Sequence, residues 1–371
     1  MWSSGTRTHP PIPLQELHEV VTLKLTKKFA AFAAIGASAL LVAGCATAAE
    51  ETAVEEETTT TTTEAASDQT MVLVVKLTGV GWFDRMEEGV VSFASRTGID
   101  ARQDGGDDAS PEKQVALIQN LIAQNPTAIA VVPNSIEALE TVLAEARAAG
   151  IIIVGHEAVG MVNADAVIEA FDNDFYGGTI MKTLAECMGE EGEYVQMVGG
   201  FTAQSHMQWV EAAYTLQQAD FPGMTRMEEP IESKEDETVA YERAKEILAK
   251  YPNIKGFQGS ASTDVAGIGR AVQEAGLQDQ ICVMGTSIPS ITSKYLEDGS
   301  IDSIFFWDPA LAGEAQLAIA QILADGGTIS AGTDLGLVGY ESLAPLAGFD
   351  NVWVGEAAVI VDASNMAEYN F

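Results

Sequence analysis

The chain has 371 residues, of which 47% are hydrophobic, and carries 19 Lys and Arg against 54 Asp and Glu, a formal net charge of −35. This length exceeds the roughly 250–300 residues at which a single hydrophobic core stops growing, so two lobes are expected. The negative charge disfavours nucleic-acid binding, because it repels phosphate. Three cysteines in so long a chain exclude a disulfide-rich scaffold.

The N-terminal 45 residues predict export. Residues 1–22 do not fit the opening of a signal peptide and are interpreted as the product of a start codon assigned too far upstream. Residues 23–44 combine three lysines at 24–28 with an apolar run at 29–42 and a final Ala-Gly pair. The run is shorter than the about 20 residues that span a bilayer and is typical of a signal peptide. Because Cys45 follows directly, the segment resembles a bacterial lipoprotein signal with Cys45 as the lipidation site; an ordinary signal peptide is the alternative.

The next segment predicts a tether. Residues 46–70 contain six glutamates, six consecutive threonines at 58–63 and almost no large apolar side chain. Such a composition buries too little surface to offset the entropy of ordering. We therefore interpret 45–70 as the lipidated cysteine followed by a solvated tether.

From residue 71 onward, continuous apolar runs alternate with amphipathic stretches. Continuous runs are typical of strands covered on both faces, as in a parallel sheet between layers of helices. Two successive sets of this kind predict an α/β fold with two doubly wound parallel-sheet lobes. The predicted strands are 71–75, 128–132, 151–154, 193–198, 256–258, 281–284 and 303–307; the predicted helices are 85–97, 112–124, 136–149, 207–219, 238–250, 264–275 and 310–325; and 328–371 is expected to be irregular with short strands.

The segments that follow these strands are polar or aromatic, and ligands of open α/β sheets bind beyond the carboxyl ends of the strands. In chain order these segments, together with others, resemble the type I periplasmic solute-binding proteins of sugar ABC importers, a group that includes ribose-, rhamnose- and autoinducer-2-binding proteins. The resemblance is nearest to the autoinducer-2 and rhamnose type. It rests on 76–83, 131–134, 149–154, 172–173 before 177–178, 202–209, 286–289 and 306–308.

The resemblance implies two lobes that are joined by a three-crossover hinge and close on a ligand. It places the N-terminal lobe at 71–158 and 288–327, and the C-terminal lobe at 159–287 and 328–371. Ligand binding then shifts the population toward a closed form that a permease recognises.

The resemblance also suggests ligand contacts. Lys76 matches a lysine that autoinducer-2 binders use on ligand oxygens, and Glu157 stands where they have an aspartate. Ser205 and His206 occupy the place of their Asp-Gln pair, and 260–264 does not reproduce their Pro-x-Ala segment. Because of these departures, a different sugar or polyol agrees with the sequence at least as well as autoinducer-2.

A sugar or polyol site needs flat aromatic surfaces and polar groups at the hydroxyls. Each candidate residue also has a structural alternative: core packing for the aromatic rings, a surface charge for Lys76, a solvent-facing loop for His206, a helix N-cap before Val265 for Asp264 and a crossover turn for Asp308. The further candidates are Trp82, Phe83, Trp307, Asn134, Gln204, Asp264 and Asp308.

Enzyme chemistry is not predicted, and neither is a cofactor or a metal. The chain has no Gly-x-Ser-x-Gly, no Cys-x-x-Cys and no dinucleotide fingerprint after a strand. Cys187 lies in a helical pattern and Cys282 in a strand, and both are expected to be small core residues rather than a redox pair.

These observations together predict an extracytoplasmic, lipid-anchored, monomeric receptor. We expect it to capture a small neutral sugar or polyol and to deliver it to the transmembrane subunits of an ABC permease. An autoinducer-2 receptor for signal uptake and a ligand sensor without transport are the alternatives, and a glycoside hydrolase is disfavoured because no paired-carboxylate signal is present.

Overall fold

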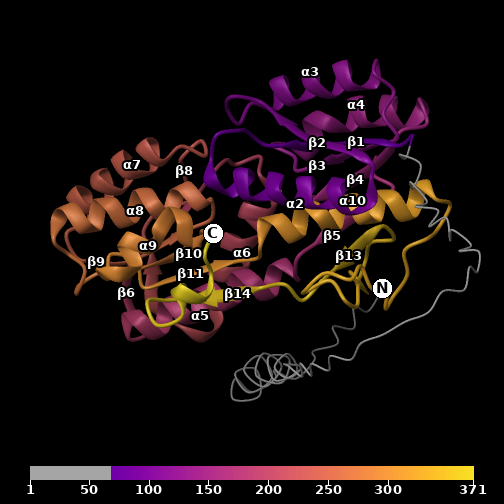
Figure 1. Cartoon of the computed structure of the whole chain (residues 1–371). Coiled ribbons are helices and arrows are strands. Elements are labelled where there is room, and N and C mark those ends of the chain that lie inside the picture. Colours follow the sequence, from indigo (N-terminus) through magenta and orange to yellow (C-terminus); the bar gives the residue numbers. More distant parts are fainter. Residues whose placement is uncertain (1–67) are drawn as a thin grey trace, which may run out of the picture. The chain divides into compact units, whose positions relative to one another are not determined.

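A computed structural model describes residues 68–371; the expected signal peptide, Cys45 and the tether up to residue 67 lie outside the described residues. The described chain forms two sheets, each built mainly from parallel strands and flanked by helices (Figure 1). This confirms the predicted α/β class with two parallel-sheet lobes.

The first sheet has the strand order β12-β13-β5-β4-β3-β1-β2, in which only the β12–β13 pair is antiparallel. Helices α3 and α4 cover one face, and α2 and α10 cover the other (Figure 1). The elements of this lobe are β1 (Thr70–Val75), α2 (Gly81–Thr97), β2 (Asp100–Gly105), α3 (Pro111–Ile122), β3 (Ala128–Val131), α4 (Ile136–Ala148), β4 (Ile152–His156), β5 (Ala166–Glu169), α10 (Pro309–Ala324), β12 (Ala344–Pro345) and β13 (Val352–Val354).

Strand β1 shows why its sequence is apolar throughout. Val72 and Val74 pack in the core cluster that contains Ile118 and Leu139 of α3 and α4. The alternate residues of β1 belong to the other cluster, which also contains Phe93 of α2. Because neighbouring residues of a strand point to opposite faces, a sheet covered on both faces needs an unbroken apolar run.

The second sheet has the strand order β14-β11-β10-β9-β6-β7, with β8 also paired to β6 and β14 antiparallel to β11. Helices α5 and α6 pack on each other, as do α7 and α8. The elements are α5 (Asn173–Met188), β6 (Glu191–Val198), α6 (Gln204–Asp220), β7 (Gly223–Arg226), β8 (Ile231–Glu232), α7 (Glu237–Lys250), β9 (Ile254–Gly259), α8 (Ser262–Ala275), β10 (Cys282–Thr286), α9 (Pro289–Glu297), β11 (Ser303–Phe306), β14 (Val359–Val361) and the 3-10 turn η1 (Met366–Glu368).

The chain passes between the sheets three times: after β5, after β11 and between β13 and β14. The strand pairing differs from the expected lobe boundaries of 71–158 with 288–327 and 159–287 with 328–371. Strand β5 pairs with β4, and β13 pairs with β5, so both lie in the first sheet; β11 pairs with β10 in the second. Pairing between strands decides these memberships, and no local pattern in the sequence records it.

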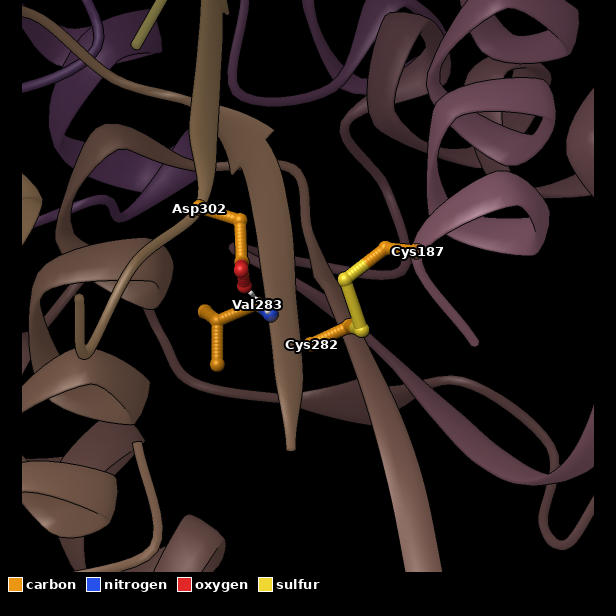
Figure 2. Close-up of a disulfide and its surroundings, with 4 residues drawn as sticks. All are labelled: Cys187, Cys282, Val283 and Asp302. Atoms are coloured by element: carbon orange, nitrogen blue, oxygen red, sulfur yellow. Dashed lines mark hydrogen bonds between the residues drawn. A yellow bond between two sulfur atoms is a disulfide. The ribbon is translucent and has the colours of Figure 1, made fainter. Parts of the chain in front are cut away.

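Cys187 and Cys282 form a disulfide, so the expectation that both are small core residues rather than a redox pair is wrong. Figure 2 shows the bond joining the end of α5 to the start of β10. The two Cα atoms are 6.1 Å apart. The residues are 95 positions apart, so only the packing of α5 on β10 brings them together. The carboxylate of Asp302 lies nearby and accepts a hydrogen bond from the Val283 amide at 2.8 Å (Figure 2).

Candidate functional site

A buried polar cluster lies where the carboxyl ends of the strands of the two lobes meet. Lys76 follows β1 and donates a hydrogen bond to Glu157, which follows β4, with Nζ and Oε2 2.8 Å apart. From α6 of the second lobe, the Ser205 hydroxyl donates to the same Oε2 at 2.8 Å, and His206 Nε2 lies 3.4 Å from Lys76 Nζ. Four sequence-predicted residues therefore meet here, with a fifth, Glu235, which sequence reasoning missed. We call these five the Lys76 cluster.

Glu235 precedes α7 and places Oε1 3.6 Å from Lys76 Nζ. Burial acts to lower the pKa of Lys76, but the charges of Glu157 and Glu235 outweigh it, and the pKa is raised. Burial acts to raise the pKa of Glu157, but the charge of Lys76, the two neighbouring histidines and the hydrogen bond from Lys76 together outweigh it and lower the pKa to about 2. Lys76 and Glu157 are therefore an ionised pair across the physiological pH range.

His206 supplies a hydrogen-bond donor next to Lys76. Burial, followed by the charge of Lys76, lowers the pKa of His206 well below its ordinary value, so the ring is neutral. Its Nδ1 accepts the Gly199 amide hydrogen at 3.2 Å. This hydrogen bond assigns the remaining ring proton to Nε2, which then faces the Lys76 ammonium. Two donors from opposite lobes thus converge, and an oxygen atom that lies beside them, within hydrogen-bond distance of each nitrogen, can accept from both.

Asn134 links the two lobes beside this cluster. Its side-chain amide donates to the Lys76 carbonyl at 2.9 Å, and its backbone amide donates to Gln114 Oε1 at 2.9 Å. Its backbone carbonyl accepts the Thr202 hydroxyl of the second lobe at 2.9 Å. The Asn134 side chain thus holds the ends of β1 and β3, while its carbonyl contacts the second lobe.

An aromatic cluster borders the Lys76 cluster. Trp82 and Trp307 meet edge to face with centroids 4.7 Å apart, and Trp209 lies 5.8 Å from Trp307. Phe171 stacks on Tyr176 at 4.0 Å, and each has its centroid within 6.3 Å of those of Trp209 and Trp307. All five rings are buried. Sequence reasoning missed three of them, because an aromatic residue in an amphipathic pattern is usually core.

His156 fixes the orientation of Trp307. Burial lowers the pKa of His156, so its ring is neutral. Nδ1 donates to the Ile168 carbonyl at 2.6 Å, and Nε2 accepts the Trp307 indole N–H at 3.1 Å. The ring of Trp209 extends the aromatic cluster to the Lys76 cluster, because it lies 5.3 Å from the His206 ring.

Four residues predicted from the sequence belong neither to the Lys76 cluster nor to the aromatic cluster. Asp308 caps α10 and accepts two hydrogen bonds from Arg85 at 2.9 and 2.8 Å. Phe83 is a buried core residue in the first turn of α2, and its carbonyl accepts from Gln103. Gln204 begins α6 and is half-buried.

Asp264 is the fourth of these residues. It lies in the first turn of α8, which begins at Ser262, and not at a cap before Val265. It accepts hydrogen bonds from the Ser260 and Ala261 amides and the Ser233 hydroxyl. Burial raises its pKa to about 7.

The end of β9 presents further polar atoms that sequence reasoning missed. Within the described chain, Gln258 Nε2, Ser260 Oγ and Thr263 Oγ1 are buried and have no hydrogen-bond partner. Leaving buried polar atoms unpaired costs free energy, so they favour a ligand or water that pairs with them. Hydroxyl and amide residues at a strand end were the only available signal in the sequence.

Comparison with known proteins identifies the family. Residues 71–328 match the model of the periplasmic binding protein domain. The chain belongs to this family. This periplasmic binding protein is 28% identical over 189 residues to a D-apiose import binding protein of Paraburkholderia graminis. The aligned region covers 48% of this chain and 56%, about half, of that protein. It is 26% identical over 261 residues to the D-allose-binding periplasmic protein of Escherichia coli, covering 67% of this chain and 82% of that protein.

Solved structures show the same fold. A solute-binding protein from Clostridium phytofermentas with bound L-rhamnose superposes with a TM-score of 0.76 at 22% identity, covering 82% of this chain and 98% of that chain. LsrB from Clostridium saccharobutylicum in complex with AI-2 superposes with a TM-score of 0.75 at 19% identity, covering 81% of this chain and 100% of that chain. In residues 68–371, no helix combines the length and the apolar character needed to cross a membrane.

Proposed function

We propose that this periplasmic binding protein is an extracytoplasmic receptor that captures a small neutral sugar or polyol between its lobes. The convergence of Lys76 and His206 from opposite lobes, beside the Glu157 carboxylate, carries this proposal. A sugar hydroxyl both accepts and donates, so its oxygen can accept from Lys76 and His206 while its hydrogen is donated to Glu157. The ligand thereby joins the lobes, which is the requirement for closure on binding.

The aromatic cluster supports a ring-shaped ligand. Trp82 and Trp307 provide apolar surface next to charged acceptors, as the ring face and hydroxyl edge of a sugar require. Relatives named for D-apiose and D-allose, and a structural neighbour with bound L-rhamnose, favour the same ligand class. Delivery to an ABC permease and anchoring through a lipidated Cys45 are further parts of this proposal.

A tryptophan-fluorescence titration of the full chain tests the ligand class. The panel contains apiose, allose, rhamnose, arabinose, other pentoses and hexoses, and autoinducer-2. We expect a saturable fluorescence change with one sugar at a Kd in the micromolar range, which corresponds to a binding free energy of about −8 kcal/mol. Saturation with autoinducer-2 alone instead indicates a receptor for signal uptake, and silence across the panel contradicts the sugar assignment without affecting the fold.

Variants test the position of the site. Ser205→Ala removes one partner of Glu157 Oε2 and should weaken binding of the responding ligand by about tenfold, the value of one hydrogen bond to a charged group. Ser92→Ala, an exposed serine of α2, is the matched control and should bind like the parent. Equal affinities for both variants would place the ligand elsewhere.

A further inference from the structure

The titratable side chains closest to Lys76 are those of Glu157, Glu235 and His206. The two glutamates have left-handed backbone conformations. Glu157 has φ of 53° and Glu235 has φ of 57°, and Lys234, which precedes Glu235, has φ of 62°. The left-handed region is unfavourable for residues other than glycine and is retained where the surroundings or the function require it. The segment 234–235 therefore turns Glu235 toward the first lobe at a conformational cost.

Gly199 makes room for the Glu235 side chain. A Cβ atom on Gly199 would lie 2.8 Å from both Cδ and Oε1 of Glu235, closer than Cβ contacts come in proteins. The Gly199 carbonyl also accepts the Glu235 amide hydrogen at 3.1 Å. The carboxylate is thus seated over the glycine backbone and is only 11% exposed.

The arrangement surrounds one ammonium with two carboxylates. Lys76 contacts Glu157 of its own lobe at 2.8 Å and Glu235 of the other lobe at 3.6 Å. His206 is neutral, and the Asp264 carboxyl, which also senses the charge of Glu235, is satisfied by Ser233 and two backbone amides. No second basic side chain offsets Glu235 among the described contacts of this cluster.

We propose that Glu235 is a specificity-determining residue that excludes acidic ligands, such as sugar acids and sugar phosphates, from the site between the lobes. This inference rests on the proposed function. Burial, with the charge of Glu157 adding to it, raises the pKa of Glu235, while the charge of Lys76 opposes this shift. A ligand carboxylate or phosphate near Lys76 is brought against the buried Glu157 and Glu235, and like charges at low dielectric repel strongly. A hydroxyl or a protonated amine instead donates a hydrogen bond to Glu235, so neutral and amino sugars are the ligands that this residue admits.

Matched ligand pairs on the full chain test the proposal. The pairs are glucose with glucuronate and glucosamine, galactose with galacturonate and galactosamine, and ribose or arabinose with its 5-phosphate. We expect the parent to bind the neutral member of the responding pair at least about tenfold more tightly than the acidic member, and Glu235→Gln to reduce that ratio by about tenfold. An unchanged ratio in Glu235→Gln, or equal binding of both members by the parent, overturns the proposal.

Two further variants keep the test specific. Gly199→Ala displaces the Glu235 carboxylate without changing any charge, so it should reduce the ratio in the same direction. Glu237→Gln removes an exposed carboxylate two residues away and should leave the ratio at the parent value. A loss of discrimination in Glu237→Gln equal to that in Glu235→Gln would assign the effect to overall charge and overturn the proposal.

A ligand-free measurement separates this inference from the proposed function. If no neutral sugar binds the parent, the proposed function fails, and thermal unfolding of Lys76→Met, Glu235→Gln and the double variant still decides whether Glu235 faces Lys76. We expect the combined shift in Tm to be smaller than the sum of the single shifts, as for residues in direct contact. Additive shifts contradict the contact and overturn the inference.

Discussion

At the scale of single residues, Glu169 is an acidic side chain that the fold shifts toward its protonated, neutral form. It ends β5 beside the first crossover, accepts the Ala158 amide hydrogen at 2.8 Å and contacts Asn173 at 3.3 Å. Burial raises its pKa to about 8, although these hydrogen bonds and the charge of Lys76 oppose the shift and the charge of Glu157 adds to it. The folded protein therefore holds a proton on Glu169 at neutral pH.

This proton makes stability depend on pH. Between the ordinary pKa of 4.5 and the folded value of about 8, the folded state binds a proton that the unfolded state has lost. Hence the free energy of unfolding should fall as pH rises through this interval. Glu169→Gln mimics the protonated side chain and should show a smaller fall, measured by urea unfolding from pH 5 to 8.5. Glu87→Gln, an exposed residue of α2, is the control, and parallel curves for the parent and Glu169→Gln would contradict the assignment.

At the scale of elements, α5 and α6 approach closely because of Gly177. A Cβ atom there would lie 2.2 Å from the Trp209 carbonyl oxygen, whereas a Cβ atom on the neighbouring Gly178 would have Leu216 Cδ2 at 3.7 Å as its nearest contact. Gly177 thereby determines how closely α6 packs on α5, and with it the position of the Trp209 ring in the aromatic cluster.

The two glycines form a matched pair for mutation. Gly177→Ala should lower the free energy of unfolding by about 1–3 kcal/mol, since overpacking forces the helices apart. Gly178→Ala should raise it by about 0.5–1 kcal/mol, because alanine loses less entropy than glycine in a helix interior. Urea unfolding of both variants measures the difference, and equal effects would show that the α5–α6 contact does not depend on Gly177.

The disulfide is a second link between elements. It closes a loop of 95 residues, so its removal should cost about 2–4 kcal/mol, mainly through the unfolded chain. Cys187→Ala, Cys282→Ala and the double variant should share one lowered Tm under oxidising conditions. With a thiol reductant the parent should fall to that same Tm. A parent that keeps its advantage after verified reduction would assign the effect to packing instead.

Sequence patterns predicted the elements that are covered on both faces. The runs at 71–75, 128–132 and 151–154 correspond to β1, β3 and β4, which lie inside the first sheet. The edge strand β2 has the sequence DARQDG with half-exposed side chains, and nothing in it distinguishes a strand from a loop. Helix α2 begins at Gly81, four residues before the predicted start at 85, so Trp82 lies on the helix although the predicted range excluded it.

The candidate site was predictable only where residues directly follow a buried strand. Lys76 and Glu157 do so, and Asn134 lies three residues after the end of β3. The packing of the lobes brings Lys76 and Glu157 to Ser205 and His206. Glu235 lies in a short polar turn with left-handed backbone, and so short a segment has no hydrophobic periodicity from which its position could be predicted. Its approach to Lys76 depends on the pairing of β6 with β8 and on Gly199, two facts of tertiary structure.

At the scale of the whole molecule, the proposed lipidation of Cys45 predicts where the protein is found in the cell. If its thiol is acylated, Cys45→Ser in the native host should release the protein from the membrane fraction into the soluble extracytoplasmic or culture fraction. Mass spectrometry of the parent should show the N-terminal peptide beginning at a lipid-modified Cys45. Cys187→Ser is the control for loss of a cysteine and should stay membrane-bound. Equal partition of parent and Cys45→Ser would exclude the anchor.

The buried indoles have a spectroscopic consequence. Trp82 comes from α2 of the first lobe, Trp209 from α6 of the second and Trp307 from the crossover between them, with neighbouring centroids 4.7 and 5.8 Å apart. At such separations the electronic transitions of the rings couple, and asymmetric aromatic packing produces near-ultraviolet circular dichroism. Any separation of the lobes changes this coupling. The near-ultraviolet circular dichroism of the unlabelled protein should therefore report opening and closing of the lobes.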